Sequence, residues 1–125
     1  MFKHLILVGI GGGLGSMLRY LTSLWIYKLS PNTVFPWATF FVNISGCLLI
    51  GLFLGLASKH SFFNQELRYL LVAGFCGGYT TFSAFSAENF NLLEKGQYMT
   101  LAAYILASVA IGILAFYIGY QISKN

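Results

Sequence analysis

The sequence predicts an all-α membrane protein whose chain crosses a bilayer four times. Of its 125 residues, 58% are hydrophobic and only 8% are charged, whereas soluble domains carry roughly a quarter charged residues. Four apolar stretches, residues 5–27, 37–57, 67–93 and 98–122, account for nearly the whole chain. Each of them reaches the length of about 20 residues that a helix needs to cross the hydrocarbon core.

The connections between these stretches are short and polar. Residues 28–36 contain both prolines, residues 58–66 contain Lys59, His60 and Asn64, and residues 94–97 form a tight turn. No soluble domain fits into any of them, so residues 1–125 are predicted to form a single four-helix transmembrane domain with no enzymatic domain outside the bilayer. The first stretch is longer than the apolar region of about 7–15 residues in a secretory signal, and no A-x-A-like cleavage site follows it.

Basic residues are divided weakly between the two sides of the predicted bundle. With four crossings, the two termini and the second connection share one side, which carries Lys3, Lys59, Arg68 and Lys124. The other side carries Lys28 and Lys95. Such a small bias specifies orientation poorly under the positive-inside rule. Insertion in both orientations and a weakly oriented single topology are both compatible with it.

The first stretch contains a cluster of glycines and one arginine. The glycines lack an exact G-x-G-x-x-G register and a Walker lysine, so nucleotide binding is not expected. Gly11 and Gly15 instead indicate a site where another helix approaches closely. Arg19 either extends to the membrane interface or forms a positive vestibule that concentrates anions. The residues alone do not choose between these two roles.

The second stretch has small and polar residues at every fourth position, namely Asn43, Cys47, Gly51 and Gly55. This spacing places them on one face of a helix, which we interpret as an interface within the subunit or between two copies. Cys47 and Cys76 are interpreted as small packing residues. The amide of Asn43 either bonds neighbouring helices together or offers two N–H donors to an anion without adding charge.

The third stretch predicts a helix that stops and restarts near mid-membrane. Its centre combines Gly74, Gly77 and Gly78 with Thr80 and Thr81. Glycine weakens a helix interior by about 1 kcal/mol relative to alanine, and threonine is a good cap. An interruption would expose carbonyls that suit a small cation and amides that suit an anion. The alternative is a glycine kink that only improves packing.

Beyond this point, Phe82, Phe85, Ser86 and Asn89 share one helix face. Phenylalanines in a membrane helix often face lipid or fill the core, but here hydroxyl and amide side chains surround them. Ring edges carry positive partial charge and attract an anion without holding it as strongly as a full cation would. Glu88 is the one acidic residue expected inside a span, where it would line or anchor one end of a pathway.

In the fourth stretch, Tyr104, Ser108 and Gly112 follow one another at a spacing of four. Their two hydroxyl groups therefore lie on one face of the helix. We interpret this face either as a packing surface or as the continuation of a hydrogen-bonding track through the membrane.

Three motifs together resemble the family of fluoride channels called Fluc or CrcB. They are Gly12-x-x-Gly15-x-x-x-Arg19-Tyr20, Val42-Asn43-x-x-Gly46 and Gly74-Phe75-Cys76-Gly77-Gly78-x-Thr80-Thr81-Phe82-Ser83-x-Phe85-Ser86. The third motif is highly specific. The resemblance covers the first three helices, and the length and helix count agree over the whole chain. Departures are modest: Ala84 replaces a more common threonine, Cys47 a common serine, and Tyr79 occupies a variable position.

The resemblance implies an antiparallel, dual-topology homodimer in the lipid bilayer of the bacterial inner membrane, with two pores that export fluoride passively. It implies that Phe82 and Phe85 form a phenylalanine box, that Asn43 lines the pore, and that a structural sodium ion is held by the backbone carbonyls of Gly77 and Thr80 of both subunits. With the polar residues identified above, the expected fluoride pore comprises Asn43, Thr81, Phe82, Ser83, Phe85, Tyr104 and Ser108, and the expected vestibules contain Arg19 and Glu88.

Other functions are less compatible with these residues. An enzyme is not expected, because the three acidic residues form no evident metal cluster and no nucleophile has an adjacent base. We also expect no nucleic-acid partner. A small dual-topology, proton-coupled multidrug exporter remains the main alternative, because Glu88 could carry protons. An accessory packing subunit is a further alternative.

Overall fold

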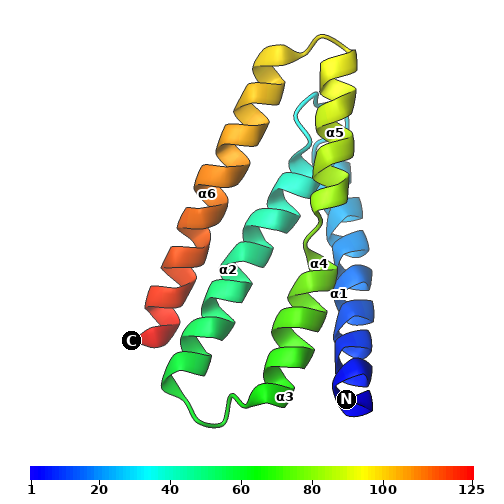
Figure 1. The fold of residues 1–125 in the computed structure, drawn as a ribbon. Coiled ribbons are helices and arrows are strands. Elements are labelled where there is room, and N and C mark those ends of the chain that lie inside the picture. Colours follow the sequence, from blue (N-terminus) through cyan, green and yellow to red (C-terminus); the bar gives the residue numbers. More distant parts are fainter.

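The computed structural model describes all of residues 1–125 as four long helical runs that lie side by side (Figure 1). Three runs are continuous helices, α1 (Phe2–Leu29), α2 (Trp37–Lys59) and α6 (Tyr98–Lys124). The other run consists of α3 (Gln65–Leu67), the π-helical segment η1 (Arg68–Cys76), α4 (Gly77–Tyr79) and α5 (Phe82–Glu94). All four runs are long and apolar enough to span a membrane. The prediction of an all-helical chain with four helices of membrane-spanning length and composition is confirmed.

The helices extend beyond the predicted apolar stretches at most of their ends. The first and last helices were predicted over residues 5–27 and 98–122, and they run instead over Phe2–Leu29 and Tyr98–Lys124. The added residues include Lys3, Lys28 and Lys124. Helical hydrogen bonding continues into polar sequence, since hydropathy locates the bilayer core and not the helix ends.

Helices pair off within the bundle. Helix α2 packs along α6, while α1 packs along η1 and α4. Both termini lie at one end of the bundle, so the α1–α2 connection and the α5–α6 turn meet at the opposite end (Figure 1). This arrangement matches the predicted division of basic residues between the two ends.

Glycines allow the backbone of α1 to approach the third run closely. A Cβ atom at Gly15 would collide with the carbonyl oxygen of Phe75 and the amide of Tyr79, and one at Gly78 would collide with the backbone of Gly12. No side chain fits at these two positions. Gly13, on another face of α1, has open space around it. Gly11 and Gly15, the two glycines predicted to mark a close helix approach, therefore lie at one.

The small-residue stripe of the second stretch faces α6. A Cβ atom at Gly51 would meet the backbone of Phe116, and one at Gly55 would meet the Ser123 hydroxyl and the Tyr120 carbonyl. Gly112 of α6 in turn lies near the sulfur of Cys47. Of the two alternatives left open by the sequence, the structure places this interface within the subunit.

Between α4 and α5 the chain is extended for two residues. Thr80 has φ −82° and ψ 157°, and Thr81 has φ −148° and ψ 117°. The hydroxyl oxygen of Thr81 accepts a hydrogen bond from the amide of Ala84 at 3.1 Å, which is the usual arrangement of a helix N-cap. Gly77 and Gly78 precede this point and remain helical.

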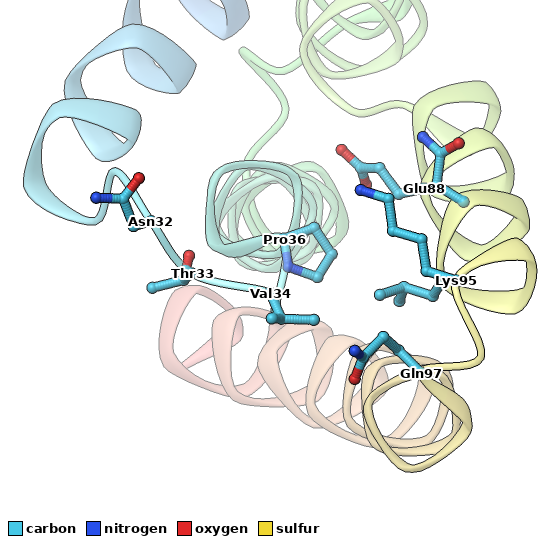
Figure 2. A pocket seen from close by; sticks show the side chains of 9 residues that line it. Asn32, Thr33, Val34, Pro36, Glu88, Lys95 and Gln97 are labelled. Atoms are coloured by element: carbon cyan, nitrogen blue, oxygen red, sulfur yellow. The ribbon is translucent and has the colours of Figure 1, made fainter.

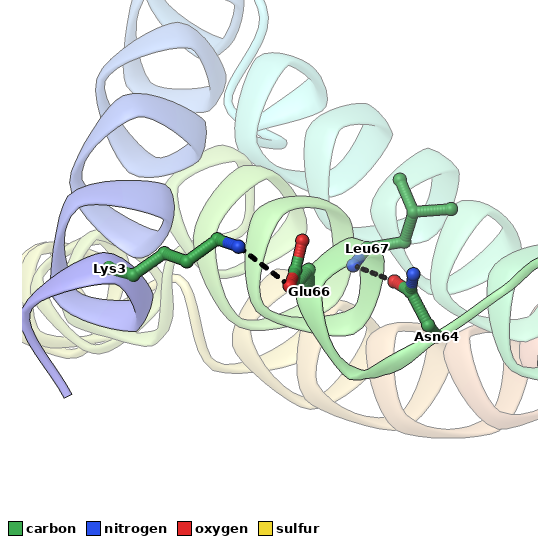
Figure 3. A network of polar contacts seen from close by, with 4 residues as sticks. All are labelled: Lys3, Asn64, Glu66 and Leu67. Carbon is green, nitrogen blue, oxygen red and sulfur yellow. Dashed lines mark hydrogen bonds and ion pairs between the residues drawn. The ribbon is translucent and has the colours of Figure 1, made fainter.

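Polar contacts secure the ends of the third run. The side-chain oxygen of Asn64 caps α3 by accepting from the amide of Leu67 at 3.0 Å. Lys3 of α1 forms an ion pair with Glu66 at 2.8 Å (Figure 3). Both partners of this pair are exposed, so water and salt screen it and it adds little to stability. At the other end, Gly96 closes the α5–α6 turn with φ 69°.

Candidate functional site

Asn43 of α2 faces the extended residues between α4 and α5. Its amide nitrogen donates to the carbonyl oxygen of Thr81 at 3.0 Å, and its amide oxygen accepts from the Thr81 N–H at 2.8 Å. Both backbone groups of Thr81 would otherwise lack a helical partner, and an unpaired buried polar group is costly. The side chain thus satisfies the backbone here, and one of its two amide hydrogens remains free for a further acceptor.

Beside Asn43 lies an open groove of about 170 Å³, which we call the inner groove. Its walls are Asn43, Phe82, Phe85, Ser108 and Val109. The groove therefore brings together four of the seven predicted pore residues, from three different helical runs. An amide, a hydroxyl and two aromatic rings supply hydrogen-bond donors and ring edges without any fixed charge.

The two phenylalanines differ in how far they project from the subunit. Their ring centroids are 5.8 Å apart, and the planes are tilted by 41°. Phe82 is 79% exposed, whereas Phe85 is partly buried. One wall of the inner groove, Phe82, is consequently largely uncovered by its own subunit.

The hydroxyl of Ser108 is buried and has no hydrogen-bond partner. A buried polar group in this condition costs about 1–3 kcal/mol. Ser108 also lines the inner groove, so an unpaired hydroxyl lies in the wall of that groove. The side-chain oxygen of Asn89 is likewise buried without a partner, but Asn89 lines none of the cavities.

The remaining predicted hydroxyl residues lie around the inner groove. Thr81 lines a second open groove of about 230 Å³, which shares Asn43 and Phe82 with the first and also includes Cys47 and Thr80. Ser83 lines no cavity, and its hydroxyl reaches the hydroxyl of Thr81 at 3.2 Å. Ser83 is the predicted pore residue that the structure brings least into the site.

Tyr104 is fully buried and connects the inner groove to Glu88. Its ring lies 4.9 Å from the ring of Phe85, and its hydroxyl donates to one carboxylate oxygen of Glu88 at 2.7 Å. The other carboxylate oxygen accepts from the hydroxyl of Thr39 at 2.6 Å. Both oxygens of Glu88 are therefore engaged by hydroxyl donors, as a buried carboxylate requires.

The sequence prediction missed two residues of this cluster. Thr39 precedes Asn43 by four residues, so the helical spacing that linked Asn43 to Cys47 could have included it. Phe35 lies in the α1–α2 connection and packs edge-on against the Tyr104 ring at 5.3 Å. No sequence signal would have identified this second contact, because the two residues are far apart in the chain.

Glu88 also lines the largest of the four cavities, which has a volume of about 300 Å³ and which we call the mouth cavity (Figure 2). It lies between the α1–α2 connection and the end of α5. Its lining is mainly polar and consists of Asn32, Thr33, Val34, Pro36, Glu88, Asn91, Leu92, Lys95 and Gln97.

Arg19 lines a separate cavity of about 260 Å³ together with Ser16, Tyr20, Ser23, Thr39, Val42, Thr81 and Ala84. Its Nε atom donates to the carbonyl oxygen of Gly78 at 3.1 Å. The side chain therefore points toward the α4–α5 region and is partly buried. A guanidinium at this position makes the cavity attractive to anions.

Four successive carbonyl groups, those of residues 77–80, lack their usual helical partners, and Gly77 and Thr80 are among them. The amide of Thr81, which would bond the Gly77 carbonyl in a continuous helix, donates to Asn43 instead. The amide of Ala84 donates to the Thr81 hydroxyl and not to the Thr80 carbonyl. No other backbone amide takes the place of these donors. Carbonyl oxygens in this state suit a hard cation.

Comparisons with known proteins place the chain among a set of close relatives. It is 50% identical over 123 residues to a protein of Flavobacterium psychrophilum named fluoride-specific ion channel FluC, with 98% of each chain covered. It is 48% identical over 122 residues to a protein of the same name from Phocaeicola vulgatus, with 98% of this chain and 99% of the relative covered. The family model described as CrcB-like protein, Camphor Resistance (CrcB), matches residues 6–120. The chain belongs to the CrcB-like protein family.

Proposed function

We propose that this protein is a fluoride-selective channel through which fluoride leaves the cell passively. The observation that carries the proposal is the inner groove, where Asn43, Phe82, Phe85 and Ser108 converge. The names of the relatives, which describe a fluoride-specific ion channel, support the same function. Those names describe a channel and not an enzyme.

Fluoride is a small, strongly hydrated ion and a strong hydrogen-bond acceptor. To enter the groove it must exchange water for other donors, and Asn43 and Ser108 offer an N–H and an O–H that the subunit leaves unused. Ring edges of Phe82 and Phe85 add weak positive partial charge. Because none of these groups is ionised, the ion is held loosely enough to move on, as conduction requires.

The inner groove is completed, in this proposal, by a second copy of the chain. Phe82 is 79% exposed and would otherwise present its ring to lipid beside polar groups. A two-fold symmetric dimer repeats every surface, so it contains the groove twice and has two pores. Antiparallel association of the two copies is consistent with four basic residues at one end of the bundle and two at the other.

The carbonyls of Gly77 and Thr80 are the groups that would hold a structural sodium ion at the centre of such a dimer. Their helical partners are diverted to Asn43 and Thr81, and carbonyl oxygens are the ligands that hard cations prefer. One subunit supplies two of these oxygens and the second copy would supply two more. The ion would offset the cost of burying these oxygens unpaired.

A proton-coupled exporter is the rival function, and Glu88 is the residue on which it depends. Thr39 and Tyr104 each donate a hydroxyl hydrogen bond to Glu88. These bonds stabilise a carboxylate that stays in place and lines a pathway, rather than one that binds and releases a drug cation.

The proposed location is the bacterial inner membrane, where a passive fluoride path removes fluoride that has entered the cell.

Efflux from liposomes distinguishes the two functions. Vesicles containing the purified protein are loaded with potassium fluoride, and external fluoride is followed with an electrode after valinomycin is added. The channel should release fluoride rapidly when no pH gradient is present. Release that requires a proton gradient, or that stops when the gradient is collapsed, would support the exporter and contradict the channel.

A further inference from the structure

The mouth cavity is the largest of the four cavities, and the predicted pore residues do not account for it. It lies at the end of the bundle where the α1–α2 connection meets the end of α5 (Figure 2). Glu88 is the only residue that it shares with the expected pathway. Glu88 connects this cavity to the inner groove through its hydrogen bond to Tyr104, whose ring contacts Phe85.

Helix α5 contributes residues to both the inner groove and this cavity. Phe82, Phe85, Glu88 and Asn91 follow one another at a spacing of three, and Lys95 comes four residues later. At 3.6 residues per turn this row winds gradually around the helix, so Asn91 lies about half a turn round from Phe82, whereas Glu88 and Lys95, seven residues apart, lie on nearly the same side. Of these five residues, the first two line the inner groove, and the last three line the mouth cavity.

Charge at the mouth raises a difficulty for an anion pathway. Glu88 is the one acidic residue in the lining, and its carboxylate repels an approaching anion. Lys95 is the one basic residue in the lining. Its side chain extends from the end of α5 toward Glu88 (Figure 2), and Asn91, Asn32 and Gln97 add uncharged amide donors around it.

We infer that the mouth cavity is an anion-collecting site, in which Lys95 offsets the charge of Glu88 and draws fluoride toward the pore. This inference rests on the proposed channel function. The ligand class is a small inorganic anion, held by one ammonium group and amide N–H donors. Lys95 lines the mouth cavity. It therefore changes the local concentration of fluoride and does not change the selectivity of the channel.

A purely structural role for Lys95 makes different predictions. Lys95 follows the last residue of α5, where a cation interacts favourably with the helix dipole. That role would change the melting temperature of the protein, and it would alter the number of folded channels and not the way in which conductance depends on ionic strength. An electrostatic role at the mouth, in contrast, depends on salt, because the Debye length falls from about 30 Å at 0.01 M to about 3 Å at 1 M.

The test compares Lys95→Gln with Lys28→Gln in planar bilayers. Lys28 is the other lysine at this end of the bundle, and it does not line the mouth cavity. Fluoride conductance is measured at one fluoride concentration, with large impermeant ions setting the ionic strength at about 0.01 M and about 1 M. We expect Lys95→Gln to lose roughly two- to five-fold in conductance at low ionic strength and to match wild type at high ionic strength. Lys95→Arg should behave as wild type, and Lys28→Gln should be unchanged in both conditions.

Three results would overturn the inference, and they are distinguishable. If wild type conducts fluoride and Lys95→Gln matches Lys28→Gln at low ionic strength, the mouth does not collect anions, while the channel function stands. If Lys95→Gln loses the same fraction of conductance at both ionic strengths, its role is structural. If wild-type protein conducts no fluoride, the proposed function fails and the inference fails with it.

Discussion

The amide side chain of Asn43 lies between the backbone of Thr81 and the inner groove. On one side it bonds both backbone groups of Thr81, and on the other it faces the inner groove with Phe82, Phe85 and Ser108. The sequence left open whether Asn43 joins helices or serves an anion. The hydrogen bonds establish the first role, and the free amide hydrogen leaves room for the second. We therefore expect a change at Asn43 to affect both stability and conduction.

Replacing Asn43 with Asp should abolish conduction and also lower the melting temperature. A carboxylate keeps an acceptor for the Thr81 N–H, but it places a second oxygen against the Thr81 carbonyl, where the amide now donates at 3.0 Å. The loss of this bond should cost about 1–3 kcal/mol of stability. Fluoride efflux and thermal unfolding in detergent measure the two effects. Wild-type efflux from the variant would show that Asn43 only packs.

Ser108→Ala provides the contrasting case at the same groove. The Ser108 hydroxyl makes no hydrogen bond within the subunit, so its removal should leave stability unchanged or raise it by up to about 1 kcal/mol. Fluoride efflux should nevertheless fall, because the groove loses one of its donors. Loss of stability without loss of efflux would contradict the position given to Ser108.

Phe82 and Phe85 should matter for flux more than for folding. Replacing either ring with Ile keeps an apolar side chain but removes the positive ring edge, so fluoride efflux should drop at least about tenfold if the rings contribute more than about 1.4 kcal/mol to the barrier. Phe90→Ile is a matched control, since Phe90 lies on the same helix, is exposed and lines no cavity. Equal efflux from all three variants would remove the phenylalanines from the pore.

Single residues were predictable where their chemistry is unusual for a membrane span. Asn43, Glu88 and Arg19 stand out because polar groups are rare there, and the structure gives each of them a polar partner. Thr39 and Phe35 did not stand out. Their importance comes from contacts with Glu88 and Tyr104, and such contacts depend on how separate helices pack.

At the scale of the helices, glycine has a different effect from the one that local propensity suggests. The glycines before Thr80 were expected to weaken the helix, yet Gly77 and Gly78 are helical. The extended residues are Thr80 and Thr81, and Asn43 of α2 bonds the backbone of Thr81. Packing against α1 explains Gly78, which lies directly against the backbone of Gly12. Tertiary contact thus outweighs intrinsic propensity here.

A pair of alanine substitutions in α1 tests this role of glycine. Gly15→Ala should destabilise the protein by about 1–3 kcal/mol, because its Cβ would collide with the backbone of Phe75 and Tyr79. Gly13→Ala should leave stability unchanged or raise it by about 0.5–1 kcal/mol, since it meets open space and alanine favours the helix. Thermal unfolding in the same detergent measures both. Equal melting temperatures would refute the close α1–α4 packing.

Helix pairing could be anticipated only in part from the sequence. The spacing of Gly51 and Gly55 identified an interface on α2, but not that α6 occupies it. Likewise, several glycines cluster in the first stretch, and only the structure distinguishes those in contact, such as Gly15, from Gly13, which is free. A small-residue pattern marks a close approach without naming the partner.

For the whole molecule, composition was enough to give the number of membrane-spanning helices. Lengths, apolar content and short connections fix this number, because each span needs about 20 residues. The site could not be obtained in the same way. Its groups come from α2, α5 and α6 and meet only once these helices pack, and Phe82, one wall of the inner groove, is largely exposed in the single subunit. Closure by a second copy remains a proposal.

Neutral donors beside the extended residues of the third run are proposed to pass fluoride and to exclude chloride. Measuring the efflux of fluoride and chloride side by side tests this selectivity most directly. Liposomes containing wild-type protein are loaded with one potassium salt or the other, and loss of each anion is followed with its own electrode after valinomycin is added. Fluoride should leave rapidly, while chloride should leave no faster than from protein-free vesicles. Chloride loss as fast as fluoride loss, or retention of both ions, would contradict the account.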